Sequence, residues 1–299
     1  MGKDILQLKP NFYGLGVDLN EICRRWKKMR GAGHDVSVLA ARFLQLFAEH
    51  GVRATSIPRL VPDLRYSDLA GERALLAALT PRMLENVAAL FSVRLSWLIG
   101  ESDVIYETDY SYKSPMRLLQ RVSSLKRDAY NMPLRAISAA EELSKDAGRS
   151  QRLELVLVEP IATIDDATIY RYHPFADGWE WSYPECRIQL KAMVRALRRP
   201  VPLYKASRNQ IEQAYSGSLF YRSVLSGPLL TEPSLEDYAM GPSESSRAKE
   251  LVEMPLVLSY MRENGLHRGN GVRCTSGPQA RLSISDQTVL ISGGERSEA

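Results

Sequence analysis

The hydrophobic periodicity of the chain changes near residue 150, and this change constrains the fold more than any other feature. Over the first third of the chain, apolar side chains recur every three or four positions, which is typical of amphipathic helices. From Leu153 onward, short apolar runs of strand length alternate with helical patterns. We therefore predict an α+β protein with an N-terminal all-α domain, a helical connector and a C-terminal mixed α/β domain.

Local signals place the helices of the N-terminal domain, residues 1–101. Asp18 followed by Glu21 is a capping pattern, and Thr80-Pro81 is a strong helix start. The expected helices cover roughly residues 18–30, 37–50, 55–60, 67–79 and 81–91. Short links between such helices predict a compact bundle.

Residues 102–150 are predicted to be a linker followed by connector helices. The stretch 101–114 is polar and rich in tyrosine, which is typical of a linker. Ser114-Pro115 repeats the cap-plus-proline helix start, and a second apolar stripe follows Pro133 at Leu134, Ile137 and Ala140. These two helices would form a connector or a dimerisation hairpin.

Residues 151–299 are expected to form an α/β domain for sensing or assembly. Ser207 with Gln210 is a capping pattern that starts one of its helices. Other predicted helices lie near 186–197 and 247–264, the latter interrupted at Pro255. The predicted strands are 153–159, 167–174, 201–204 and 219–225, with a closing hairpin formed by 281–285 and 288–292.

The composition excludes several classes of protein. With 299 residues, 25% charged and 44% hydrophobic, the chain is an ordinary folded protein rather than a disordered or fibrous one. No apolar run approaches the roughly 18 residues of a membrane helix, and the start is not a secretory signal. The three cysteines are far apart and lack CxxC spacing, which excludes a disulfide framework and a zinc module. We expect a cytoplasmic protein with no membrane partner.

The net charge of +4 lies wholly in the first third of the chain. Residues 1–101 hold 14 Lys/Arg and 10 Asp/Glu, whereas the remainder holds 25 of each. Such an asymmetry indicates an anionic partner, such as nucleic acid, for the N-terminal domain. A chance imbalance of a few charges is the alternative.

The segment 84–101, LENVAALFSVRLSWLIGE, carries the most informative pattern. An apolar helix is followed by a turn containing Val93, then by Trp97-Leu98 and Gly100. This segment resembles the C-terminal helices of the phage-repressor-like (Cro-type) helix-turn-helix family. The resemblance implies a domain that binds double-stranded DNA, with its helix-turn-helix within Gly51–Leu79. Such units usually read two half-sites as a homodimer.

Basic and hydroxyl side chains near that motif are the candidate DNA contacts. Lys and Arg gain free energy by releasing counterions from phosphates, Arg reads guanine, and Ser or Thr serves either role. The candidate phosphate contacts are Arg24, Arg25, Lys27, Lys28 and Arg30. The candidate base contacts are Arg53, Thr55, Ser56 and Arg59, with Arg65, Tyr66 and Ser67 as second choice. A solvated helix face, or a bundle without DNA contacts, is the alternative.

Two features of the C-terminal domain suggest further partners. Residues 184–222 are rich in Lys and Arg, which would touch DNA flanks or pair with acids elsewhere in this neutral domain. Residues 169–185 concentrate aromatic residues and resemble, faintly, the autoinducer-sensing domains of quorum-sensing regulators. The candidate ligand-binding residues for a small-molecule effector are Tyr170, Tyr172, Trp179, Trp181 and Tyr183. Plain core packing is the alternative.

Signals for catalysis are poor, and we expect neither a cofactor nor a metal. No dinucleotide, Walker or nucleophile-elbow motif occurs, and the four histidines are scattered. Asp165, Asp166 and Glu185 with Lys191 allow a metal-dependent nucleic-acid-processing enzyme as an alternative. A protein-binding adaptor is the third possibility. The leading hypothesis is a DNA-binding transcriptional regulator whose C-terminal domain senses a ligand or mediates oligomerisation.

Overall fold

The computed structural model describes residues 37–125, 133–141, 143–144, 150–197, 201–234 and 253–266. The contacts group Met1–His267 into one compact unit and Arg268–Ala299 into a second. The second unit lies outside the described residues, and so do the residues 281–292 for which a closing hairpin was predicted. The predicted helix over 18–30 also lies outside them.

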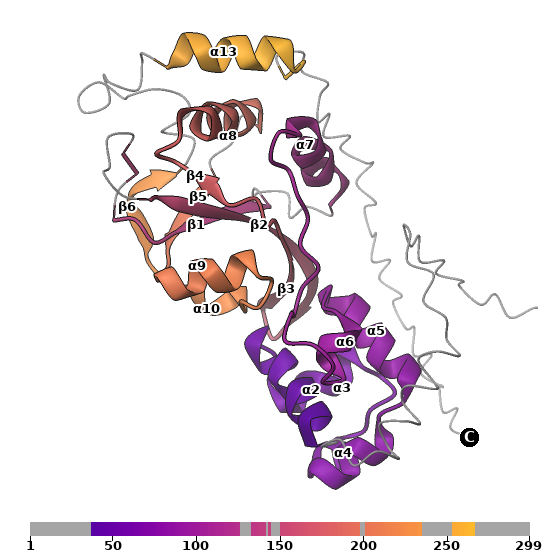
Figure 1. Cartoon of the computed structure of the whole chain (residues 1–299). Helices are drawn as coiled ribbons and strands as arrows, with labels where there is room; N and C mark the ends of the chain where they lie inside the picture. The colour runs from indigo at the N-terminus through magenta and orange to yellow at the C-terminus, as the bar shows by residue number, and fades with distance from the viewer. Residues whose placement is uncertain are drawn as a thin grey trace, which may run out of the picture. The chain divides into compact units, whose positions relative to one another are not determined.

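The protein is α+β, with helices in its N-terminal part and a mixed sheet in its C-terminal part (Figure 1). We call residues 37–100 the helical lobe, residues 101–110 the interlobe segment, and the described residues from 111 to 266 the sheet lobe. The helical lobe contains α2 (Ser37–Glu49), η1 (Ala54–Ser56), α3 (Ile57–Leu60), η2 (Tyr66–Leu69), α4 (Glu72–Ala78), α5 (Pro81–Phe91) and α6 (Leu95–Leu98), where η denotes a 3₁₀ helix.

Local sequence signals decide where the helices of this lobe begin and end. The Thr80 hydroxyl accepts a hydrogen bond from the Met83 amide at 3.2 Å, and Pro81 opens α5, as predicted. Gly51, with φ +80°, follows α2. The helix expected over 67–79 is divided into η2 and α4, which is preceded by Gly71. Glycine disfavours a helix interior, so the apolar stripe does not produce one continuous helix.

The described residues contain one six-stranded mixed sheet. Its strands are β1 (Leu134–Ser138), β2 (Arg152–Ile164), β3 (Ala167–Pro174), β4 (Trp179–Glu180), β5 (Pro202–Lys205) and β6 (Leu229–Ser234). The order is β3-β2-β1-β5-β6, with β4 paired to β2. β1 and β5 are parallel, and the other pairs are antiparallel.

The strands β2 and β3 form a long hairpin. Its turn residues, Asp165 and Asp166, both adopt left-handed backbone conformations, with φ values of 48° and 64°. Aspartate tolerates this region better than most residues do, and two such residues match the right-handed twist of a hairpin. The predicted strand over 167–174 is confirmed to the residue.

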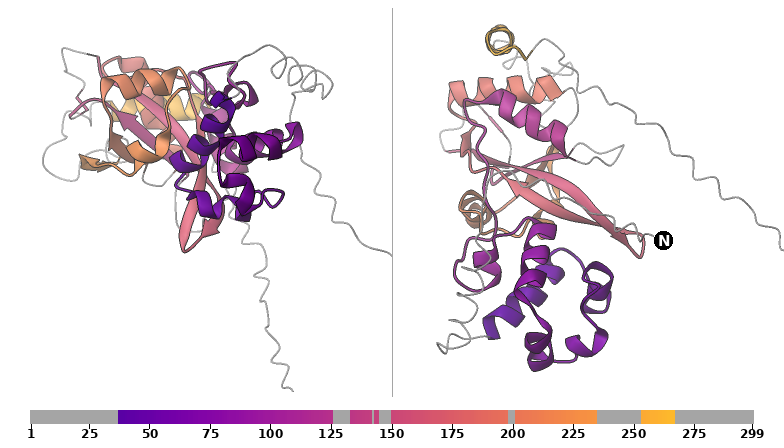
Figure 2. Two further views of the ribbon diagram at one scale, coloured as in Figure 1. Left: turned by 90° about the horizontal axis from the view of Figure 1, so that it is seen from below. Right: turned by 90° about the vertical axis from the view of Figure 1, so that its right-hand side faces the viewer.

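Helices cover both faces of the sheet. On one face, α7 (Pro115–Ser124) and α8 (Pro184–Leu197) pack on Leu153, Leu155 and Leu157, and α13 (Met254–Glu263) packs on α8. On the other face, Val156 and Val158 meet α9 (Arg208–Tyr215), α10 (Tyr221–Leu225) and the helical lobe. Figure 2 shows this layering from the side. We call these the α8 face and the α10 face.

Two sequence predictions for the sheet lobe are wrong. Leu134, Ile137 and Ala140 do not continue a helical stripe, because Leu134–Ser138 is the strand β1, paired on both edges. Residues 219–225 are not a strand but contain α10. Both runs are short and apolar, and such runs carry too few residues for their period to separate helix from strand. Of the helix predicted over 247–264, residues 247–252 lie outside the described residues, and Pro255 lies in the first turn of α13.

The interlobe segment, predicted to be a linker, is packed between the two lobes. Ile105 and Tyr106 are buried, and their amides donate to the Gly217 carbonyl at 2.9 and 3.0 Å. Farther along, the buried Asp177 carboxylate accepts from the Ser111 and Tyr112 amides at 2.6 and 2.9 Å. The segment therefore fixes the helical lobe against the sheet lobe.

Within the described residues, no single helix has the length and apolar character to cross a bilayer. The helices α4 and α5 meet that condition only when taken together, and they bend by 98° relative to each other.

Candidate functional site

The candidate DNA contacts divide into a part that the structure describes and a part that it does not. Arg24, Arg25, Lys27, Lys28 and Arg30 lie outside the described residues. The other candidates lie on the η1–α3 and η2 turns, between α2 and α4. The predicted base contacts can therefore be located, whereas the phosphate contacts of 24–30 stay a prediction.

The first-choice base contacts do not share one exposed helix face. Arg53, Thr55 and Arg59 are exposed, but Ser56 is buried. The helix α3 has only four residues, which is about one turn. Arg59 extends toward the sheet lobe, where its Nη1 donates to Asp165 Oδ1 at 2.6 Å. Ser56 is thus not available to a base edge without a change in packing.

The second-choice residues lie together at the start of η2. Arg65, Tyr66 and Ser67 are consecutive and exposed, and the Tyr66 side chain has 65% of its surface accessible. A hydrogen bond within the turn fixes its backbone, because the Arg65 amide donates to Asp68 Oδ2 at 2.8 Å. Leu64 and Leu75 on either side are buried in the lobe core. The side chains of this turn therefore project from a fixed backbone.

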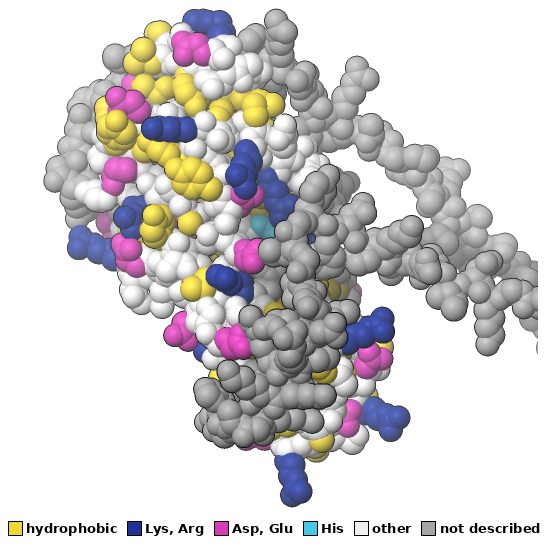
Figure 3. Space-filling model, turned by 45° about the vertical axis from the view of Figure 1, so that its right-hand side comes forward, with side chains coloured by type: hydrophobic (Ala, Val, Ile, Leu, Met, Phe, Trp, Pro, Cys, Tyr) yellow, Lys and Arg dark blue, Asp and Glu magenta, His cyan; other side chains and the backbone are white. Residues whose placement is uncertain are grey.

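The helical lobe carries further exposed arginines. Arg73, Arg82 and Arg94 are exposed on α4, on α5 and before α6. In the part of the chain that the structure describes, no ion pair involves any of them or Arg53 or Arg65. Lys and Arg side chains project around the end of the helical lobe in Figure 3, with Asp and Glu side chains between them.

The five aromatic residues proposed to bind an effector lie on opposite sides of the sheet. Tyr172 is buried on the α10 face, and Tyr170 packs against that same core. Trp179 and Trp181 are buried in the core of the α8 face, and Tyr183 is exposed. The structure therefore does not bring these side chains around a common cavity.

Tyr172 instead belongs to an aromatic cluster that joins the two lobes. His50, at the end of α2, lies 4.5 Å from Phe91 and 5.4 Å from Tyr172 between ring centroids. Its Nδ1 bonds the Leu46 carbonyl oxygen at 2.7 Å, and its Nε2 is 3.5 Å from the Tyr106 hydroxyl. Burial lowers the pKa of His50 to about 4, and it raises the pKa of Tyr106 well above its usual value. This aromatic cluster between the lobes is thus built of neutral groups.

Two basic residues of the stretch 184–222 are paired with one acid. Arg187 and Lys191 on α8 are buried beneath Glu253 at the start of α13. Arg187 Nε donates to both Glu253 carboxylate oxygens, at 3.1 and 3.0 Å, and Lys191 Nζ donates to Oε2 at 2.9 Å. These bonds lower the pKa of Glu253 to about 2 despite its burial. The pairing with acids anticipated for this region is therefore present, and its main partner is Glu253.

A second buried ionic cluster lies on the α8 face at the β2–β3 hairpin. Glu159 accepts from Arg171 Nε at 2.9 Å and from His173 Nε2 at 3.1 Å, and His173 Nδ1 lies 3.3 Å from Arg121 Nη2 on α7. These donors lower the pKa of Glu159 to about 2. Because both ring nitrogens of His173 face partners, this histidine holds α7 on the sheet.

Glu154 is buried on the α10 face of the same strand, without a basic partner of this kind. It receives one long bond, from the Gly178 amide at 3.4 Å, and its Oε1 atom has no hydrogen-bond partner in the structure. Burial raises its pKa to about 8. The nearby Tyr221 hydroxyl is also buried and without a partner.

The carboxylates of the enzyme alternative do not form a metal site. Asp165 and Asp166 are the turn residues of the β2–β3 hairpin, Lys191 pairs with Glu253, and Glu185 lies in the first turn of α8. Among the described residues, no group of three or more His, Cys, Asp and Glu side chains is placed to hold a metal ion.

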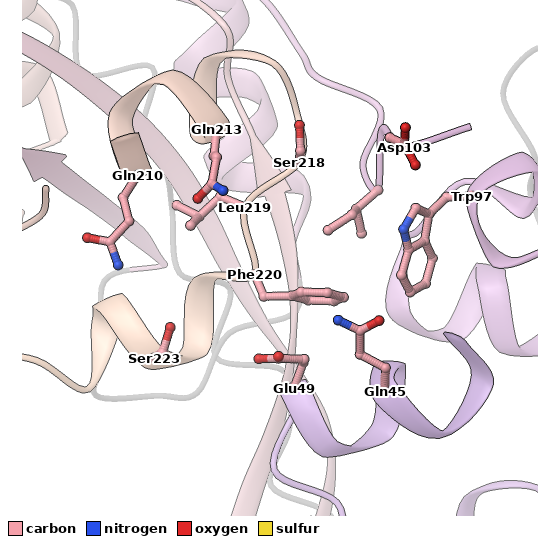
Figure 4. Close-up of a pocket in the computed structure, with 11 residues that line it drawn as sticks. Gln45, Glu49, Trp97, Asp103, Gln210, Gln213, Ser218, Leu219, Phe220 and Ser223 are labelled. Atoms are coloured by element: carbon pink, nitrogen blue, oxygen red, sulfur yellow. The ribbon is translucent and has the colours of Figure 1, made fainter. Parts of the chain in front are cut away.

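A cleft of about 400 Å³ lies between the two lobes. The helical lobe contributes Gln45 and Glu49 from α2 and Trp97 from α6. The sheet lobe contributes residues of α9, of the segment between α9 and α10, and of α10 itself. Figure 4 shows Phe220 in the middle of these side chains. The full lining is Gln45, Glu49, Trp97, Asp103, Ile105, Gln210, Gln213, Ser218, Leu219, Phe220 and Ser223.

Sequence reasoning missed His50, Tyr106, Glu154 and the cleft. His50 was visible as the last member of the α2 stripe, and a histidine at that position is a signal for burial. Glu154 interrupts an apolar strand, LELVLV, which is also a signal. Nothing local identified the cleft, because its walls come from segments more than a hundred residues apart.

Comparisons with models of known families, with characterised proteins and with solved structures gave no significant match.

Proposed function

We propose that this protein is a DNA-binding transcriptional regulator of the cytoplasm. The helical lobe would bind double-stranded DNA, and the sheet lobe would sense a ligand or mediate assembly. The observation that carries the proposal is the exposed turn Arg65-Tyr66-Ser67 at the start of η2, held on a fixed backbone in a lobe with further exposed arginines.

The side chains of this turn suit the groups of a duplex. Arginine bonds guanine edges or phosphates, tyrosine and serine hydroxyls bond phosphates, and a tyrosine ring packs on sugars. With 65% of its surface exposed, Tyr66 is accessible to a partner. Arg53, Arg73 and Arg82 would add contacts to the phosphate backbone.

The order of elements in the helical lobe agrees with this role. After α2, two short elements, η1–α3 and η2–α4, are joined by a turn at 61–65, and α5 and α6 complete the core. In a helix-turn-helix, the N-terminal residues of the second element approach the base edges. We therefore assign the recognition role to Arg65–Ser67, the second choice from sequence. A homodimer would present two such turns to two half-sites.

Fluorescence anisotropy of the full chain with labelled mixed-sequence duplexes tests the proposal. Binding at low salt is expected, weakening as salt rises because counterions are released. Arg65→Ala should weaken binding by about tenfold, as a lost base or phosphate contact does. Arg262→Ala, an exposed arginine on α13, is the matched control and should leave affinity unchanged.

The outcomes separate clearly. Absence of binding at low salt would refute DNA binding by this chain. Equal losses in Arg65→Ala and Arg262→Ala would refute the assignment of the recognition turn, since they would indicate unspecific attraction to positive charge. Loss of binding in Tyr66→Ala together with unchanged folding, checked by circular dichroism, would support it.

A further inference from the structure

The cleft between the lobes is polar and has one sign of charge. Its charged lining residues are Glu49 and Asp103, and its other polar side chains are the amides and hydroxyls of Gln45, Gln210, Gln213, Ser218 and Ser223. Carboxylates only accept hydrogen bonds, whereas the amides and hydroxyls both donate and accept, and Gln210 Oε1 already accepts from the Ser207 amide. The preference of this lining for a cationic N–H donor therefore comes from its two carboxylates.

The two carboxylates differ in their surroundings. Arg42 Nη2 donates to Asp103 at 3.0 Å, while its Nη1 donates to the Trp97 and Ser102 carbonyl oxygens. Asp103 is therefore partly neutralised. Among the ion pairs within the described residues, none involves Glu49. The Arg222 side chain lies against Gly51 just beyond the end of α2, outside the cleft lining.

The position of Glu49 adds to the negative potential. It is the last residue of α2, a helix of 13 residues with no basic residue in its last turn. The carboxyl end of a helix carries partial negative charge and favours cations. Gln213 lies in the last turn of α9, which also lacks a basic residue. Two helix ends and a carboxylate therefore act on the same cleft.

Aromatic rings complete the lining. Phe220 and Trp97 are arranged edge to face with centroids 5.6 Å apart, and Arg42 lies 5.5 Å from the centroid of the Trp97 ring. The Arg42 guanidinium, a cation of the protein itself, thus already lies close to this aromatic surface. Phe220 is half-buried in the middle of the cleft, where its ring can receive a second cation or an alkyl chain.

From this combination we propose that the interlobe cleft binds a small organic cation of the polyamine type. Its ammonium groups would meet Glu49 and the glutamine and serine oxygens, and its methylene chain would lie on Phe220. A volume of about 400 Å³ accommodates such a molecule. The ligand would contact α2 of the helical lobe and α9–α10 of the sheet lobe together. It is a site distinct from the DNA-binding turn, and the proposal does not depend on DNA binding.

Isothermal titration of the full chain with spermidine tests this proposal, and triethylene glycol serves as an uncharged chain of similar length. Saturable binding of spermidine is expected, with no heat from triethylene glycol. Glu49→Gln, which keeps the shape and removes the charge, should weaken spermidine binding at least tenfold. Gln213→Ala should weaken it about threefold. Glu107→Gln, an exposed carboxylate of the interlobe segment outside the cleft, is the matched control.

Three results would overturn the proposal: no saturable binding of spermidine, equal binding of triethylene glycol, or equal weakening by Glu49→Gln and Glu107→Gln. Equal weakening by the two variants would show that spermidine is attracted to the acidic surface in general and not to the cleft. Thermal unfolding of each variant in the absence of probe separates a lost site from a lost fold, and Gln213→Ala keeps the test valid if Glu49→Gln is unstable.

Discussion

The two faces of the sheet treat buried ionisable groups in opposite ways. On the α8 face, Glu159 and Glu253 are ionised and held by arginine, lysine and histidine, with pKa values lowered to about 2. On the α10 face, Glu154 and His50 lie among aromatic rings, and their pKa values move to about 8 and about 4, toward the neutral forms.

Two glutamates on one strand, β2, show this difference most clearly. Glu154 and Glu159 are both buried on β2, five positions apart in the sequence and on opposite faces. Burial raises the pKa of each carboxyl, but only Glu159 meets charged donors from β3. The lesson is that the partner elements, rather than burial itself, decide whether a buried carboxyl stays charged.

The largest effect is expected from removing the acid beneath α13. Glu253→Ala removes the carboxylate that pairs with Arg187 and Lys191, both of which are nearly fully buried. We expect a loss of about 3 kcal/mol in the free energy of unfolding, and a smaller loss if α13 separates from α8. Urea denaturation measures the loss of stability. Hydrogen exchange of 254–263 measures whether α13 separates from α8. Unchanged stability and exchange would show that the ion pairs do not hold α13.

Replacing the acid of the hairpin cluster should cost somewhat less. Glu159→Gln removes the charge that faces Arg171 and His173, and we expect a loss of about 2 kcal/mol because Arg171 is partly exposed. The pKa of Glu159 is lowered from 4.5 to about 2, so its contribution is present above pH 4.5 and lost as pH falls through 2. The destabilisation by Glu159→Gln should therefore shrink between pH 4.5 and pH 2. A constant difference would contradict the assigned pairing.

The opposite sign is expected on the other face. The pKa of Glu154 is raised from 4.5 to about 8, so its contribution is present below pH 4.5 and lost as pH rises through 8. Glu154→Gln should be more stable than the natural chain by about 2 kcal/mol at pH 9, with no gain at pH 4. Denaturant unfolding at both pH values measures this, with Glu107→Gln as control. A loss of stability at pH 9 would mean that a cation reaches Glu154.

The smallest effect concerns His50. Its pKa is lowered from 6.5 to about 4, so its neutral form contributes stability above pH 6.5 that is lost as pH falls through 4. Between pH 7 and pH 5.5, the natural chain should lose about 1 kcal/mol relative to His50→Asn. The asparagine amide can replace the bond to the Leu46 carbonyl. Denaturant unfolding at several pH values measures this difference. If the free energies of unfolding of the two proteins change in parallel with pH, His50 is solvated in its protonated form.

Local signals in the sequence were sufficient for many elements. The Thr80 cap, the proline after it, the glycine after α2 and the Ser207–Gln210 capping box all operate within four residues, and each is present in the structure. The alternating run 167–174 became β3 for the same reason. The runs at Leu134–Ser138 and 219–225 were misassigned, because pairing with β2 and β5 or packing under the sheet decides their form.

The functional residues divide in the same way. Arg65, Tyr66 and Ser67 were recognisable as candidates because polar exposed residues before a helix are a local pattern. The cleft was not recognisable, since Glu49 and Gln213 are brought together only by the aromatic packing of His50, Tyr106 and Tyr172.

By itself, the sequence determined the α+β class, the order of helices before sheet, and most helix starts, because these depend on side-chain period and on capping between near neighbours. Only the tertiary structure decided which face of β2 each glutamate occupies, that the predicted linker is packed between the lobes, and that the aromatic residues of 170–183 belong to two different cores. Burial, pKa and cleft formation depend on groups distant in sequence, and their energies arise only when folding brings those groups into contact.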